Sequence, residues 1–142
     1  MNHGFTILEL AIVLTLIALI SAATAPTVFS SWDRLRVRAA REEFAGQLER
    51  ARAAALRAGA ATLELRADSG LVRVLLEGSI DSEVDLGERY GVRMSLGGGA
   101  PTARLRFGRL GLGRVASRTV GLFRRGDTVS VSVSTYGRLR RW

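Results

Sequence analysis

The sequence contains no cysteine and no lysine, and its single histidine is His3, close to the N-terminus. Without cysteine, the chain forms no disulfide framework and offers neither a thiolate metal ligand nor a thiol nucleophile. Removal of the segment that carries His3 would also take away the usual zinc ligand and the base of a Ser-His-Asp triad. An enzyme built on this chain would therefore depend on carboxylates alone.

Charge is distributed unevenly along the chain. All 21 cationic residues are arginines, and the formal net charge is +8 at pH 7. Residues 26 to 100 carry 11 arginines and 11 acidic residues, whereas residues 101 to 142 carry 10 arginines and a single acidic residue, Asp127. The basic excess belongs to the C-terminal part, which is the candidate surface for anionic partners.

One long apolar run lies near the N-terminus, from Phe5 to Ala25, and contains the carboxylate of Glu9. As a helix with a rise of about 1.5 Å per residue, the run would be about 32 Å long, which is enough to cross a hydrocarbon core of about 30 Å. A charged side chain inside a bilayer costs about 2.5 to 3.5 kcal/mol, so Glu9 is predicted to have a function. We predict a transmembrane or assembly helix over residues 5 to 26.

Two features of the flanks complicate this interpretation. Ser21-Ala22-Ala23 would serve as a cleavage site for a secretory signal peptide, but the basic region that normally precedes such a run is missing. Several arginines follow the run, between Arg34 and Arg41, and a positive-inside count would place the C-terminal part in the cytoplasm. Long domains are translocated largely regardless of charge, so this count does not decide the orientation.

The residues Gly4-Phe5-Thr6-Ile7-Leu8-Glu9 resemble the processing site of type IV pilins and type II secretion pseudopilins. The resemblance implies that prepilin peptidase cuts after Gly4, removes residues 1 to 4 as a leader and methylates the new N-terminus at Phe5. It also implies that Glu9 pairs with the terminal amine of a neighbouring subunit during assembly. This agrees with the lower cost of opposite charges that are paired in a low-dielectric setting.

The same resemblance implies a cellular location and a set of partners. The chain is expected in the bacterial inner membrane, crossing it once, with its N-terminus in the cytoplasm and its head outside. Membrane lipid, prepilin peptidase and other pilins or pseudopilins are the expected partners, and the filament is the expected final location. No cofactor is implied.

Apolar residues continue to recur beyond Pro26, at spacings of three to five, which predicts an amphipathic continuation of the helix over residues 27 to 59. The helix is expected to run from about residue 5 to about residue 58 and to end at Gly59. Its predicted buried face consists of Phe29, Trp32, Leu35, Ala39, Phe44, Leu48, Ala51 and Ala55.

Residues 60 to 142 are predicted to form a β-rich head with a basic C-terminal segment. Polar and apolar residues alternate there between clusters of turn residues, which is typical of a half-buried antiparallel sheet. A hairpin is expected first, and the predicted strands are Thr62–Arg66, Val72–Leu75, Tyr90–Leu96, Arg104–Phe107, Arg118–Phe123 and Thr128–Thr135. The predicted fold class is α+β, with a long N-terminal helix, membrane-spanning in its first half, packed on a mainly antiparallel sheet.

This order of elements resembles the GspH-type minor pseudopilins and the FimT-type minor pilins. The resemblance covers nearly the whole chain and implies a pilin-like fold with a β-rich head. Members of this subgroup are low-abundance subunits that prime or cap a filament, in a type IV pilus or in a type II secretion pseudopilus. This is the expected function of the chain.

The C-terminal sequence Gly137-Arg138-Leu139-Arg140 resembles a Gly-Arg-x-Arg motif that is associated with DNA binding in FimT-type pilins. Guanidinium groups neutralise phosphates, and an aromatic side chain stacks on an unpaired base. The candidate contacts are Gly137, Arg138, Arg140, Arg141 and Trp142, with Arg124 and Arg125 from the preceding loop. The alternatives are a solvated tail, an acidic surface of a partner pilin, or anionic lipid head groups.

Three other features are predicted to be structural, so neither a catalytic site nor a metal site is expected. The carboxylates of Asp81, Glu83 and Asp85 are placed in a loop without a partner base and are expected to be solvated. The tripeptide Arg125-Gly126-Asp127 is explained by a tight connection between strands rather than by adhesion. The glycines from Gly97 to Gly99 lack the following lysine or helix start of a phosphate-binding loop.

Overall fold

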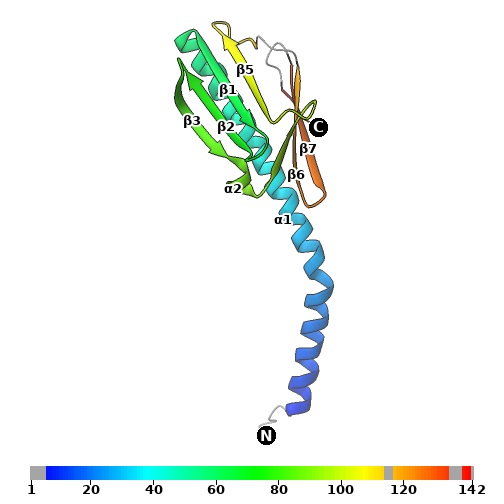
Figure 1. Ribbon diagram of the computed structural model, residues 1–142. Helices are drawn as coiled ribbons and strands as arrows, with labels where there is room; N and C mark the ends of the chain where they lie inside the picture. The colour runs from blue at the N-terminus through cyan, green and yellow to red at the C-terminus, as the bar shows by residue number, and fades with distance from the viewer. Residues whose placement is uncertain (1–5, 114–116, 135–138, 142) are drawn as a thin grey trace. The chain divides into compact units, whose positions relative to one another are not determined.

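The computed structural model describes residues 6–113, 117–134 and 139–141, and the side chains of residues 23–30, 139 and 141 are outside this description. The chain divides into two compact units, Met1–Trp32 and Asp33–Trp142, of which the second is the head. The elements in chain order are α1 (Ile7–Ala58), β1 (Ala60–Arg66), β2 (Leu71–Leu76), β3 (Ser79–Asp85), α2 (Leu86–Tyr90), β4 (Arg93–Leu96), β5 (Thr102–Gly108), β6 (Arg118–Arg124), β7 (Asp127–Val133) and β8 (Leu139–Arg141) (Figure 1).

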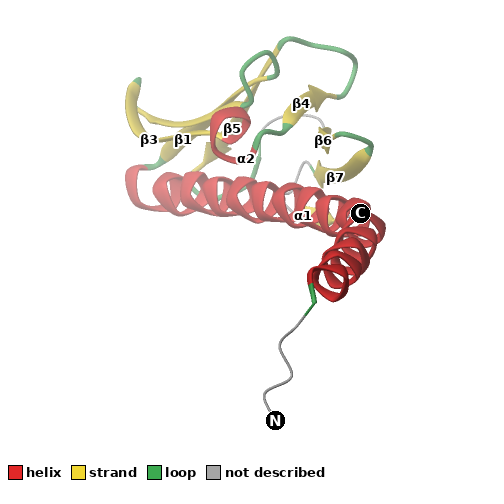
Figure 2. Ribbon diagram, turned by 90° about the horizontal axis from the view of Figure 1, so that it is seen from below, coloured by secondary structure: helices red, strands yellow, loops and turns green. Residues whose placement is uncertain are grey.

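The head contains two antiparallel sheets of four strands each, with the orders β3-β2-β1-β5 and β4-β6-β7-β8. The head part of α1 lies across one face of both sheets (Figure 2). The core is formed where this helix meets the inward side chains of the strands, with Phe44, Leu48, Leu63 and Leu122 among the fully buried residues. The α+β class and the antiparallel pairing are confirmed, but the single predicted sheet is in fact two.

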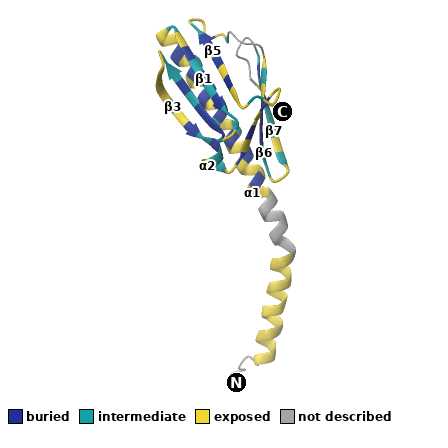
Figure 3. Cartoon of the chain, viewed as in Figure 1, coloured by how far each residue is buried: buried dark blue, intermediate teal, exposed yellow. Residues whose placement is uncertain are grey.

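The predicted buried face of the helix is correct only from Phe44 onward. Trp32 and Leu35 are 59% and 57% exposed, Ala39 is also exposed, and the side chain of Phe29 lies outside the described set. The core is instead reached through Asp33 and Val37. Figure 3 shows buried positions recurring along the head part of α1. A helix turns by about 100° per residue, so the spacing of five from Ala39 to Phe44 changes the direction by about 140°.

The ends of the secondary-structure elements follow local chemistry that the sequence shows. Helix α1 ends at Gly59, which has a positive φ of 87° and whose N–H donates to Ala55 O at 2.8 Å, as predicted. The predicted hairpin is formed by β1 and β2, with Leu65 opposite Val72. Arg125 and Gly126 form the two-residue connection between β6 and β7, both with positive φ, so the tight connection predicted at this tripeptide is confirmed.

Three elements were missed: strand β8 within the basic C-terminal segment, and two elements between β2 and β4. The expected loop that carries Asp81 and Glu83 is strand β3, which pairs with β2 and has few apolar residues to reveal it. The expected start of a strand at Tyr90 is instead the end of helix α2, which is only one turn long. The prediction was wrong at both places because neighbouring strands and caps, rather than periodicity, determine the local structure.

Candidate functional site

The first turn of α1 places Glu9 at the third helical position. Thr6 precedes the helix, and its side-chain Oγ1 accepts a hydrogen bond from the Glu9 N–H at 3.2 Å. A Thr followed by a Glu three residues later is the pattern of a capping box, and a carboxylate in this turn is favoured by the helix dipole. Gly4 and Phe5, the predicted cleavage and methylation site, lie outside the described residues.

The helix surface that follows Glu9 is apolar and exposed. Eight large apolar side chains from Leu10 to Ile20, among them Ile12 and Leu16, are exposed. The polar side chain of Thr15 is satisfied within the helix, because its hydroxyl donates a hydrogen bond to Ala11 O at 2.7 Å. A surface of this size on one helix is typical of a segment that other apolar groups cover.

No helix in the described ranges is long and apolar enough to cross a membrane. The predicted membrane span covers residues 5 to 26, and Phe5 and the side chains of residues 23 to 26 lie outside the described set. The span therefore stays a prediction.

In the head, an ionic network joins α1 at Asp33, where the head part of this helix begins, to the β6–β7 hairpin. Arg124 Nε donates to Asp33 Oδ1 at 2.6 Å, and its Nη1 donates to Tyr90 O and Gly91 O, both at 3.0 Å. Asp33 is buried, and the hydrogen bond from Arg124 lowers its pKa below the usual 3.8, although partial burial acts in the opposite direction. Arg124 therefore has a structural role in this fold.

The two neighbouring arginines of the hairpin differ in how far their side chains are exposed to solvent. The Arg124 side chain is 17% exposed, whereas that of Arg125 is 73% exposed and reaches Asp33 Oδ2 only at 3.9 Å. Of this predicted pair of DNA contacts, only Arg125 is open to a large ligand. Asp127 lies at the other end of the turn and meets Arg34 at 3.5 Å.

The C-terminal segment forms the outermost strand of the second sheet. β8 pairs with β7, and Arg140 is exposed and lies opposite Ser132. Gly137, Arg138 and Trp142 are outside the described residues, and so is the side chain of Arg141. Among the predicted DNA contacts at the C-terminus, Arg140 is therefore the one whose side chain the structure describes.

Arg140 belongs to a surface that we call the hydroxyl face, on the side of the second sheet opposite the core. Its cross-strand neighbours are small and polar, and Thr119 Oγ1 and Ser132 Oγ lie 3.2 Å apart. At another corner, the Arg93 guanidinium lies 4.9 Å from the centre of the Phe123 ring. The described residues that present a side chain on the hydroxyl face are Arg93, Ser95, Thr119, Phe123, Thr128, Ser130, Ser132 and Arg140. None of these eight is acidic.

The carboxylates that were expected to be solvated have structural partners in two cases out of three. Glu83 pairs with Arg73 on the adjacent strand, and Asp85 accepts a hydrogen bond from the Glu88 N–H at 2.8 Å as the N-cap of α2. Within the described part of the chain, acidic and histidine side chains form no group suited to a metal ion.

Asp33 and Thr6 are the residues whose roles the sequence analysis missed. The Thr6-x-x-Glu9 capping pattern was visible in the sequence, and Asp85-x-x-Glu88 repeats it at α2. Asp33 had no such signal, because its partner Arg124 lies 91 residues further along the chain.

Comparison with known proteins identifies the fold. No protein-family model matches the sequence, and no curated protein matches it. Among solved structures, the chain is similar to the minor pseudopilin EpsH from the type 2 secretion system of Vibrio cholerae, with a TM-score of 0.54 and 15% identity. The match covers 73% of this chain and 93% of that one. The chain therefore has a pilin-like α+β fold, in which a helix packs on antiparallel sheets.

Proposed function

We propose that this protein is a minor pilin or pseudopilin of the GspH/FimT type, a structural subunit that primes or caps a type IV pilus or a type II secretion pseudopilus. Prepilin peptidase removes residues 1 to 4, and the helix from Phe5 then holds the chain in the inner membrane, with its head outside the cytoplasm. The observation that carries the proposal is Glu9, a carboxylate in the first turn of an exposed apolar helix, on a chain with a pseudopilin-like fold.

Glu9 gives this helix a way to select its position among neighbouring subunits. The exposed apolar side chains between Ile7 and Ile20 favour packing against other apolar helices or lipid. Burial of Glu9 there without a cation is costly, and the amine of a neighbour's Phe5 supplies one. Only one axial alignment brings the two charges together, so the ion pair selects the assembled register.

Mass spectrometry of the protein from its native cells tests the processing step. The expected N-terminal peptide begins at N-methylated Phe5, because cleavage after Gly4 creates that terminus. A Gly4→Ala variant should keep its leader and serve as the uncleaved control. An N-terminal peptide that still contains Met1 in the unaltered protein would contradict the proposal.

The roles of Glu9 in capping and in assembly are separable by substitution. Glu9→Gln keeps the backbone N–H that binds Thr6 but removes the charge, and its incorporation into purified filaments should fall at least about tenfold. Thr6→Ala removes the capping hydroxyl and keeps the charge, so its incorporation should change less than about threefold. Equal losses in the two variants would show that Glu9 acts only through the helix end.

A second candidate function is the capture of DNA on the hydroxyl face. It is favoured by Arg140, which is exposed at the edge of a face whose described residues include two arginines, one aromatic ring and no carboxylate. Arginines of this kind bind phosphates and release counterions, which makes affinity strongly dependent on salt.

This candidate predicts salt-dependent binding of labelled duplex DNA by the full chain in mild detergent. Arg140→Gln should weaken binding and reduce the slope of log affinity against log salt by about one, because one phosphate contact is lost. Arg36→Gln removes the same charge from the exposed surface of α1 and is the matched control. Equal affinity and slope for the two variants would contradict a role for Arg140.

A further inference from the structure

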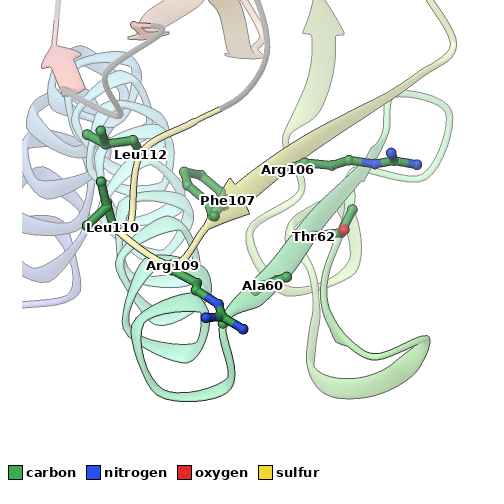
Figure 4. Close-up of a pocket in the computed structure, with 10 residues that line it drawn as sticks. Ala60, Thr62, Arg106, Phe107, Arg109, Leu110 and Leu112 are labelled. Atoms are coloured by element: carbon green, nitrogen blue, oxygen red, sulfur yellow. The ribbon is translucent and has the colours of Figure 1, made fainter.

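A hollow of about 760 Å³ lies at one end of the first sheet, where β1 begins and β5 runs into the following turn. This volume is within the usual range of ligand sites, which is about 300 to 1,000 Å³. Its exposed lining side chains include Ala60, Leu110 and Leu112, which are apolar, with Arg106 and Arg109, while Phe107 belongs to the core beneath (Figure 4).

The turn that forms one wall is held by several hydrogen bonds. The Gly111 N–H donates to Gly108 O at 2.8 Å, and the Gly108 N–H donates to Leu112 O at 3.1 Å. Arg52 Nε, from α1, donates to Gly111 O at 3.3 Å. The wall therefore exists before any ligand arrives, which reduces the entropy cost of binding.

The leucines that line the hollow are exposed, and the apolar surface continues beyond the lining. Leu110 is 77% exposed, and Leu112 and Leu56 are also exposed. Leu56 lies next to the turn, since a Cβ placed on Gly111 would be 3.5 Å from its side chain. These leucines add nothing to the core. Leu110 and Leu112 at the hollow, with Leu56 beside the turn, form a surface that a macromolecule covers better than a small ligand does.

The charged groups at the hollow are all of one sign. Arg106 and Arg109 are exposed and form no ion pair with any carboxylate that the structure describes, and no lining residue is acidic. By contrast, Arg104 on the same strand meets Glu64 at 3.6 Å. Guanidinium groups bind carboxylates through paired, charge-assisted hydrogen bonds, so the open arginines favour a carboxylate-bearing ligand.

We propose that this hollow docks a short segment of a partner protein that carries apolar side chains together with carboxylates. The apolar side chain packs against Ala60 and Leu110, and the carboxylates meet Arg106 and Arg109. The site is formed by the head alone, so the inference does not depend on filament assembly or on Glu9.

Short fluorescein-labelled peptides, measured by fluorescence anisotropy with the full chain in mild detergent, test this site. A peptide of alternating leucine and glutamate should bind at least about tenfold more tightly than leucine-glutamine and serine-glutamate peptides of equal length. The double variant Arg106→Gln, Arg109→Gln should lose at least about tenfold in affinity, and so should Leu110→Ser.

The double variant Arg36→Gln, Arg38→Gln carries the same charge change on exposed positions of α1 and should bind the leucine-glutamate peptide as the unaltered protein does. Hydrogen exchange of each variant checks that the head stays folded. Equal losses in both double variants would overturn the proposal, because the effect would then be general electrostatics. Displacement of the peptide by phosphatidylglycerol vesicles, with loss of vesicle binding in the Arg106, Arg109 variant, would also overturn it and identify a lipid site.

Discussion

The ion pair between Asp33 and Arg124 is the most informative side-chain contact of the head. It joins α1 to the end of β6 through a hydrogen bond of 2.6 Å. The same arginine also donates hydrogen bonds to the carbonyl oxygens of Tyr90 and Gly91. A buried carboxylate is stable only with such partners. The pair therefore places a charged residue on the core side of the helix, where an apolar one would be expected.

Asp33 predicts a specific pH dependence of stability. Its pKa is lowered in the folded state, so its contribution is present above the unfolded value of about 3.8 and disappears as the pH falls through the folded value. Asp33→Asn should lower Tm near neutral pH, and the difference from the unaltered protein should shrink steadily below pH about 4. Thermal unfolding monitored by circular dichroism, repeated from neutral pH to below pH about 4, measures the loss of Tm and how it shrinks with pH.

The matched control for this prediction is Arg125→Gln, whose side chain is largely exposed and only 3.9 Å from Asp33. Its Tm should stay close to that of the unaltered protein at all pH values, because exposed ion pairs contribute little. A gap between Asp33→Asn and the unaltered protein that persists at low pH would mean that shape, and not charge, is the cause.

At the scale of elements, the rotation of α1 about its axis is decided by packing against both sheets. The predicted face grouped Trp32, Leu35 and Ala39 with Phe44, although a spacing of five residues turns the helix by about 140°. The core is instead reached through Asp33, Val37 and Phe44. The exposed Trp32 and Leu35 lie on the helix surface that the sheets do not cover.

This rotation predicts opposite outcomes for one substitution at two positions of α1. Leu48→Ala should lower the free energy of unfolding by about 2 to 5 kcal/mol, because Leu48 is fully buried and the change leaves a cavity. Leu35→Ala should change it by no more than about 0.5 kcal/mol, since the side chain is exposed. Urea unfolding of both variants measures the difference, and equal losses would contradict the observed face.

At the scale of the whole molecule, the head holds the entire described core. Its hydrophobic core cluster runs from Val37 to Val133, and none of the side chains described in the first unit belongs to it. The first unit instead exposes large apolar side chains along a single helix. A chain of this kind is expected to fold its head independently of whatever covers the apolar helix.

A fragment of residues 31 to 142 is therefore predicted to fold without the apolar helix. It should unfold cooperatively, with a Tm within about 5 °C of that of the full chain in detergent, because the buried residues are unchanged. Calorimetry and a dispersed amide NMR spectrum provide the measurement. A broad transition with binding of a hydrophobic dye would show that the first unit is needed for the packed head.

The sequence by itself determined the features that depend on short-range sterics and hydrogen bonds. The end of α1 at Gly59, the first hairpin, and the turn at Arg125 and Gly126 followed from residue types within a few positions of each other. The apolar run and Glu9 were equally plain, and the resemblance that they carry agrees with the pilin-like fold.

Only the tertiary structure decided which distant segments meet. It separated the strands into two sheets, brought Arg124 to Asp33, placed Arg140 beside Ser132, and formed the hollow between the start of β1 and the end of β5. Each of these depends on contacts between residues far apart in the chain. Such contacts form only when the summed burial of the whole head offsets the entropy of closing the intervening loops.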